Sequence, residues 1–173
     1  MKPVYVLIAA LAIAAAGCGD DDSPTAPGND NLAQFTSQLL PSNEVPPAAN
    51  AESTGQGTVV IDLNLTKDSA GAITAATADF RVQFTGFPST TVINIAHIHP
   101  GAAGVNGPVR VNTTLAPGEV TVTNGAGSFV KTNIPVTAAD AQAIINNPAG
   151  FYFNVHTAAN PGGVMRGQLV RSN

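Results

Sequence analysis

The three histidines of this chain are its clearest candidates for chemistry. Two lie in the motif His97-Ile98-His99, and the third is in Asn154-Val155-His156-Thr157. On a β-strand, residues two apart point to the same face at a spacing of about 6.6 Å, so His97 and His99 can converge on one point. A third imidazole from a neighbouring strand would complete a three-nitrogen site. Because imidazole suits Zn²⁺ and Cu²⁺, His97, His99 and His156 are candidate ligands for copper or zinc.

The same histidines are also consistent with a purely structural role. Imidazoles at strand ends can fix loops by donating Nδ1–H to backbone carbonyls. Both following loops are rich in glycine and proline, namely 100–104 and 160–163. The sequence leaves loop fixing and metal binding as open alternatives, with no cofactor established and copper or zinc as the candidates.

Glu44 and Arg166 each stand in a stretch of apolar or small residues. An unpaired buried charge is costly, so we expect these two residues to form an ion pair. Such a pair would attach the N-terminal segment to the last strand.

Other catalytic chemistry has little support. The chain contains neither a Gly-x-Ser-x-Gly elbow nor a phosphate-binding loop. We therefore name no catalytic residue and expect a protein that is not an enzyme. Charged residues make up 10% of the chain, the net charge is −4, and the basic residues are scattered singly. Nucleic acid is not expected as a partner, because binding it requires a clustered basic surface.

The N-terminus resembles an export signal. An apolar run of 13 residues, 4–16, follows Lys2 and is too short to span a bilayer as a helix. The next small residues end in Gly17-Cys18, which resembles a bacterial lipobox with lipid on Cys18. An ordinary signal-peptidase site near Ala16 is the alternative. Residues 19–30 are polar, acidic and rich in proline and glycine, so they suit a spacer. We expect a signal peptide at 1–17, a lipidated linker at 18–30 and one domain at 31–173.

The remaining residues predict an all-β domain. Threonine, valine and glycine dominate, and apolar residues alternate with polar ones. Eight strands are expected over 57–65, 73–85, 92–99, 109–115, 119–123, 127–131, 151–157 and 165–170, those at 119–123 and 127–131 as a hairpin across Asn124-Gly125. A further N-terminal strand near 33–39 would add to this count. Thr137 and Asp140 resemble a capping box for one short helix that ends before Pro148. The expected architecture is an antiparallel β-sandwich of about seven or eight strands.

Three of these segments together resemble the CHRD domain, named for chordin and found in many exported bacterial proteins. They are 40–47, 96–101 with 107–109, and 151–169, and they follow the family order. The family often has glutamate before the last hydrophobic residue and arginine, whereas here Val164-Met165 precedes Arg166.

The resemblance implies an immunoglobulin-like sandwich and no assigned enzymatic activity. Together with the N-terminus, it predicts an exported lipoprotein held at the cell membrane or outer membrane through Cys18. Such a protein would display a binding or structural module to an unknown partner. The alternative function is a copper or zinc protein, with redox chemistry as one use of the ion.

Overall fold

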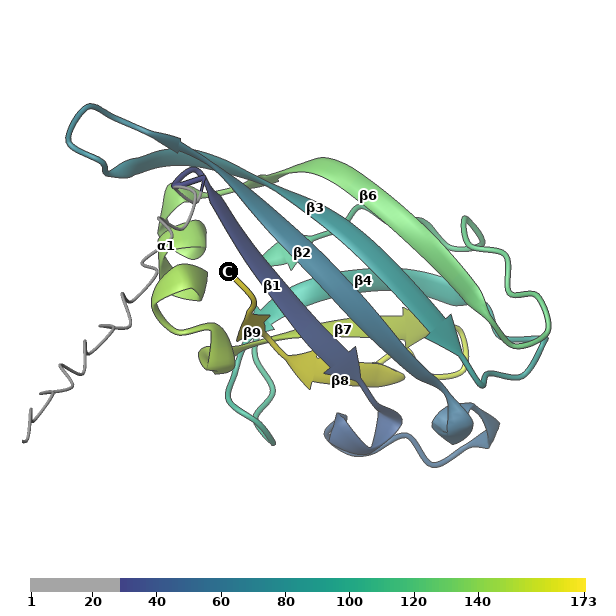
Figure 1. The fold of residues 1–173 in the computed structure, drawn as a ribbon. Coiled ribbons are helices and arrows are strands. Elements are labelled where there is room, and N and C mark those ends of the chain that lie inside the picture. Colours follow the sequence, from purple (N-terminus) through teal and green to yellow (C-terminus); the bar gives the residue numbers. More distant parts are fainter. Residues whose placement is uncertain (1–28) are drawn as a thin grey trace, which may run out of the picture.

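Residues 29–173 are described by a computed structural model as two antiparallel sheets packed face to face (Figure 1). The larger sheet has the strand order β6-β3-β2-β1-β9. Its strands are β1 (Leu32–Leu39), β2 (Gln56–Lys67), β3 (Ile73–Thr85), β6 (Gly127–Val136) and β9 (Val170–Arg171). The signal segment, Cys18 and nearly all of the expected linker lie outside the described residues.

The smaller sheet has the order β5-β4-β7-β8 and lies behind the larger one in Figure 1. Its strands are β4 (Ile93–Pro100), β5 (Val111–Asn112), β7 (Phe151–Thr157) and β8 (Met165–Gln168). The predicted all-β sandwich with one short helix is confirmed, and the described part has nine strands, two of them only two residues long.

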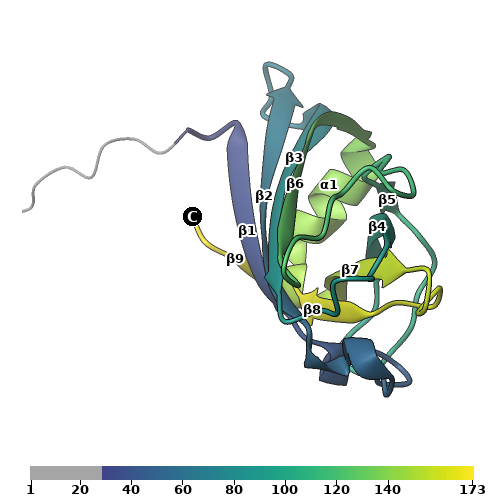
Figure 2. The same cartoon turned by 90° about the vertical axis from the view of Figure 1, so that its right-hand side faces the viewer.

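The core lies between the sheets, as the edge-on view in Figure 2 makes clear. Alternate residues of each strand point inward because side chains on a strand alternate between the two faces. Phe80 of β3 and Phe153 of β7 stack with ring centroids 5.7 Å apart and so connect the two layers. Each fully buried aromatic or aliphatic side chain contributes roughly 1.5–3 kcal/mol to stability.

The helix α1 (Ala138–Asn146) follows β6, and its cap is as the sequence predicts. The Thr137 hydroxyl oxygen accepts a hydrogen bond from the Asp140 backbone N–H at 3.0 Å, and the Thr137 hydroxyl donates to the Asp140 carboxylate at 2.7 Å. Ala141 and Ile144 are fully buried, so the helix covers one end of the core. No helix in the described part of the chain is long and apolar enough to cross a membrane.

The predicted hairpin over 119–123 and 127–131 is wrong in one arm. The turn forms, with φ of 52° at Asn124 and 77° at Gly125, but only an isolated bridge joins Thr123 to Ala126. The strand β6 pairs with β3 instead, from Gly127 onward. Residues 119–123 belong to neither sheet, and Val120 among them is buried in the core.

The predicted last strand divides at Leu169, which is buried and donates its N–H to the carbonyl of Phe151. Before this residue β8 pairs with β7, and after it β9 pairs with β1. The chain thus crosses from one sheet to the other at this point.

The outer face of the smaller sheet is buried even though it points away from the core. Three short 3₁₀ turns are present: η1 (Pro41–Asn43), η2 (Ala51–Thr54) and η3 (Pro148–Gly150). The chain around η1 crosses β8, where Asn43 donates its side-chain N–H to the Arg166 carbonyl at 3.1 Å. Loops 101–110 and 158–163 also contact this face, through Gly107 and Pro161. These segments cover the outward-facing side chains of β4, β7 and β8. We call this buried, mostly polar cluster the histidine compartment; it includes His97, His99, Tyr152, Asn154, His156 and Arg166.

Candidate metal centre

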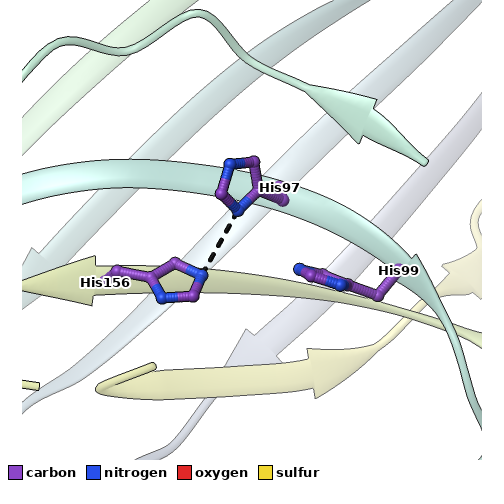
Figure 3. Close-up of side chains that lie close together, drawn as sticks. All are labelled: His97, His99 and His156. Atoms are coloured by element: carbon purple, nitrogen blue, oxygen red, sulfur yellow. Dashed lines mark hydrogen bonds between the residues drawn. The ribbon is translucent and has the colours of Figure 1, made fainter. Parts of the chain in front are cut away.

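The three histidines meet in this compartment. His97 and His99 point outward from β4, because the intervening Ile98 points into the core. His156 is on β7, which pairs antiparallel with β4 and places His156 opposite Ile95. Figure 3 shows the three rings gathered over the two strands. One ring nitrogen of each histidine lies within 4.8 Å of the others, and the residues are only 5–8% exposed.

Backbone carbonyls fix the orientation of two of these rings. His99 Nδ1 lies 3.0 Å from the Gly107 carbonyl oxygen, and His156 Nδ1 lies 2.9 Å from that of Pro161. A carbonyl only accepts hydrogen bonds, so each Nδ1 carries the proton. In the neutral ring, each Nε2 then has a free lone pair. This is the outer hydrogen bond that orients a histidine for metal binding.

Two of the three inner nitrogens contact each other, and the third has no partner among the described residues. His99 Nε2 is buried and has no hydrogen-bond partner within residues 29–173. His156 Nε2 lies 3.3 Å from His97 Nδ1 and 3.1 Å from Asn154 Oδ1. A tetrahedral ion with bonds of about 2.0–2.1 Å separates its ligand nitrogens by roughly 3.3 Å. The His97–His156 spacing already matches that value, and Asn154 Oδ1 is a candidate fourth ligand.

The compartment keeps the imidazoles neutral, which is the form that binds metal. Burial, followed by the charges of His156 and His99, lowers the pKa of His97 to about 4. Burial also lowers the pKa of His99 and of His156, although their carbonyl partners act in the opposite direction. All three imidazoles are therefore neutral near neutral pH, and each carries one proton on one of its ring nitrogens.

A second layer of contacts supports His99. The Tyr152 ring stacks on the His99 ring, with centroids 4.9 Å apart and planes 4° from parallel. The guanidinium carbon of Arg166 lies 3.9 Å from the Tyr152 ring centroid. Arg166 donates to Asn106 Oδ1 at 2.9 Å and to the Val105 carbonyl at 3.1 Å, so it also anchors loop 101–110.

Glu44 and Arg166 share this compartment but form no ion pair within 4.0 Å among the described residues. The Arg166 guanidinium is directed instead to Asn106, Val105 and the Tyr152 ring. Burial raises the pKa of Glu44 to about 7, although the charge of Arg166 lowers it. The expected direct contact between Glu44 and Arg166 is absent. A stabilising electrostatic interaction between the two side chains over a longer distance stays a prediction.

The predicted attachment of the N-terminal segment to the last strand is made by the backbone. Leu40 and Arg166 each donate an N–H to the carbonyl of the other, at 3.1 and 3.2 Å.

The three histidines were predicted from the sequence as candidate ligands, whereas no role was predicted for Asn154 or Tyr152. The signal was available in the period of two, because Tyr152, Asn154 and His156 share one face of a single strand. The role of Gly107 had no such signal. A Cβ there would lie 1.7 Å from the Pro100 carbonyl oxygen, so only glycine lets the loop approach His99 this closely.

The family model of the CHRD domain matches residues 35–169. The chain belongs to the CHRD family. The matched region runs from β1 to Leu169 and contains the whole histidine compartment of this CHRD domain. No curated protein and no solved structure matches the chain at a significant level.

The geometry of the CHRD domain is compatible with both loop fixing and metal binding by the same histidines. In His99 and His156 the Nδ1–H fixes a loop, while the opposite nitrogen faces the other histidines. The two roles use different atoms of the same ring, so the residues can serve both.

Proposed function

We propose that this CHRD domain binds one copper or zinc ion through His97, His99 and His156. The observation that carries the proposal is the convergence of three neutral imidazoles in a buried compartment. Two of the three are preoriented by backbone carbonyls. A donor set made only of imidazole suits copper and zinc better than Mg²⁺ or Ca²⁺, which prefer oxygen.

The unpartnered nitrogen of His99 favours an ion over a purely structural role. A buried polar atom without a partner costs roughly 1–3 kcal/mol. Loop fixing uses Nδ1 of His99 and gives no reason for burying Nε2 beside two more imidazoles. A bound ion would take up that lone pair and those of its neighbours.

A second candidate function is recognition of a partner by a membrane-displayed module. A hollow of about 420 Å³ opens over Glu44 and Arg166, between residues 42–47 and 103–104. Glu44 and Arg166 both line this hollow, so a polar group entering it would meet a carboxyl group and a guanidinium. This candidate would stand alone if the histidines bind no metal.

The proposed location is the surface of the cell membrane or outer membrane, with lipid on Cys18 as anchor. The support is the sequence alone: a short apolar segment, small residues before the cysteine and an acidic spacer. Two or more acyl chains give stable anchoring, whereas a single chain is marginal.

The metal proposal is tested by titrating the full chain, purified in detergent, with Zn²⁺ and separately with Cu²⁺. Calorimetry should show one ion per chain and a higher melting temperature, since an ion that binds the native state stabilises it.

The informative variants are His99→Asn and His156→Asn. An asparagine amide can keep the donor near the Nδ1 position while removing the inner nitrogen. Metal binding should then fall by at least 100-fold while the metal-free melting temperature changes little. Unchanged binding in both variants would rule out the histidine site, and a folding defect without any metal binding in the parent would leave only the structural role.

A further inference from the structure

On its β8 side the histidine compartment contains Arg166, a fully buried cation that is 1% exposed. Its guanidinium donates to two neutral oxygens, those of Asn106 and Val105. Within residues 29–173 it has no acidic partner inside 4.0 Å. Neutral acceptors do not cancel its charge, so the field of Arg166 extends into the buried surroundings.

That field reaches the proposed ligands. Arg166 lies over one face of Tyr152, and His99 stacks against the same ring. The guanidinium carbon of Arg166 lies 3.9 Å from the Tyr152 ring centroid, and the His99 ring centroid lies 4.9 Å from it. A single aromatic ring therefore separates the Arg166 charge from the proposed ligand His99.

We infer that Arg166 biases the three-histidine site toward a monovalent ion, Cu(I), over the divalent ions Cu(II) and Zn(II). This inference rests on the proposed metal site. The three ligands are neutral and contribute no negative charge, so the bound ion keeps its full charge. A positive neighbour then disfavours a divalent ion about twice as strongly as a monovalent one.

The expected size of the effect follows from Coulomb's law. The two distances across the Tyr152 ring place the guanidinium roughly 9 Å from the centre of the His99 ring. At an effective dielectric constant of about 20, one unit of charge at about this distance shifts the relative affinity for Cu(I) and a divalent ion roughly 20-fold. Glu44 is the nearby group of opposite sign, and its ionised form acts against Arg166.

The experiment compares affinities for Cu(I) and Zn(II) in the full chain in detergent. Cu(I) is measured under anaerobic conditions against a chromophoric Cu(I) chelator, and Zn(II) against a zinc-responsive dye. The variants are Arg166→Met, which removes the charge, and Arg166→Lys, which keeps it. Glu44→Gln removes the opposing carboxylate and keeps its shape.

Arg166→Met should raise the Zn(II) affinity relative to Cu(I) by about 20-fold, while Arg166→Lys should leave the ratio near that of the parent. Glu44→Gln should move the ratio the other way, toward Cu(I). A purely structural role for Arg166 would weaken both ions equally and leave the ratio unchanged, which would overturn the inference. If Arg166→Met does not fold, Arg166→Gln replaces it, because it also removes the charge but keeps hydrogen-bond donors, and the same shift is expected. If neither ion binds the parent, the metal proposal itself fails.

Discussion

The Nδ1 atom of His97 lies 3.3 Å from the Nε2 atom of His156, although the two residues are 59 positions apart in the chain. Antiparallel pairing of β4 with β7 creates this proximity, and His99 joins from the same side of β4. Backbone carbonyls hold the outer nitrogens of His99 and His156, and one nitrogen of each of the three rings lies within 4.8 Å of the others.

The buried carboxyl of Glu44 predicts a pH-dependent effect of its removal. The pKa of Glu44 is about 7 in the folded chain, against an ordinary value of 4.5 that represents the unfolded chain. The native protein therefore holds the proton more tightly than the unfolded one. The stability contributed by protonated Glu44 is therefore present below pH 4.5 and lost as pH rises through 7. Relative to the parent, Glu44→Gln should gain about 3 kcal/mol between pH 4.5 and 7.5.

Urea unfolding of both proteins in the presence of a chelator measures this difference. A stability gap between parent and Glu44→Gln that stays constant over the whole range would show that Glu44 titrates normally.

Because its pKa is lowered, His97 should make the metal-free protein less stable in acid. Its pKa is about 4 when folded against 6.5 when unfolded, so the unfolded chain binds more protons between these values. Stability is then complete above pH 6.5 and falls toward pH 4, by about 3 kcal/mol for this residue. The effect is best seen in Glu44→Gln, where the opposing titration is gone. A flat stability profile from pH 6.5 to 4 in that variant would contradict the neutral, buried imidazole.

Gly163 predicts a position-specific cost of adding one methyl group. Its φ is +127°, and a Cβ there would lie 2.5 Å from Glu44 Oε1. Gly163→Ala should lose about 1–3 kcal/mol of unfolding free energy, because it strains the backbone and displaces a buried carboxylate. The neighbouring Gly162 has open space around its Cβ position and no such φ, so Gly162→Ala is the matched control. Equal losses in the two variants would argue against close packing of this loop on Glu44.

Cys18 predicts a lipidated N-terminus. Mass spectrometry of protein recovered from membranes should show a mature chain that begins at Cys18 and carries the mass of acyl groups. Cys18→Ser should remove the modification and release the exported protein from the membrane fraction. An unmodified Cys18, or a mature chain that begins elsewhere, would replace the lipid anchor with ordinary export.

Local patterns predicted much of this fold from the sequence. The alternation of apolar and polar residues predicted β3 and β7 with the bounds that they have in the structure. The capping pattern at Thr137 predicted the start of the helix. The 119–123 arm and the division at Leu169 depend on which sheet a segment joins, and alternation within one segment carries no information about that.

The site was predictable in its ligands but not in its surroundings. The spacing of His97 and His99 and the recurrence of histidine on a second strand were visible in the sequence. The position of the Arg166 guanidinium over Tyr152, away from direct contact with Glu44, arises from loop 101–110 folding back through Val105 and Asn106. Such a contact across 60 residues has no local signature.

X-ray absorption spectroscopy of the zinc-loaded full chain measures most directly whether three imidazoles of this domain share one metal ion. Three imidazole nitrogens at about 2.0–2.1 Å are expected in the parent, and two in His99→Asn at the same loading. A shell made of oxygen atoms, or one that keeps the same number of imidazoles in His99→Asn, would contradict it.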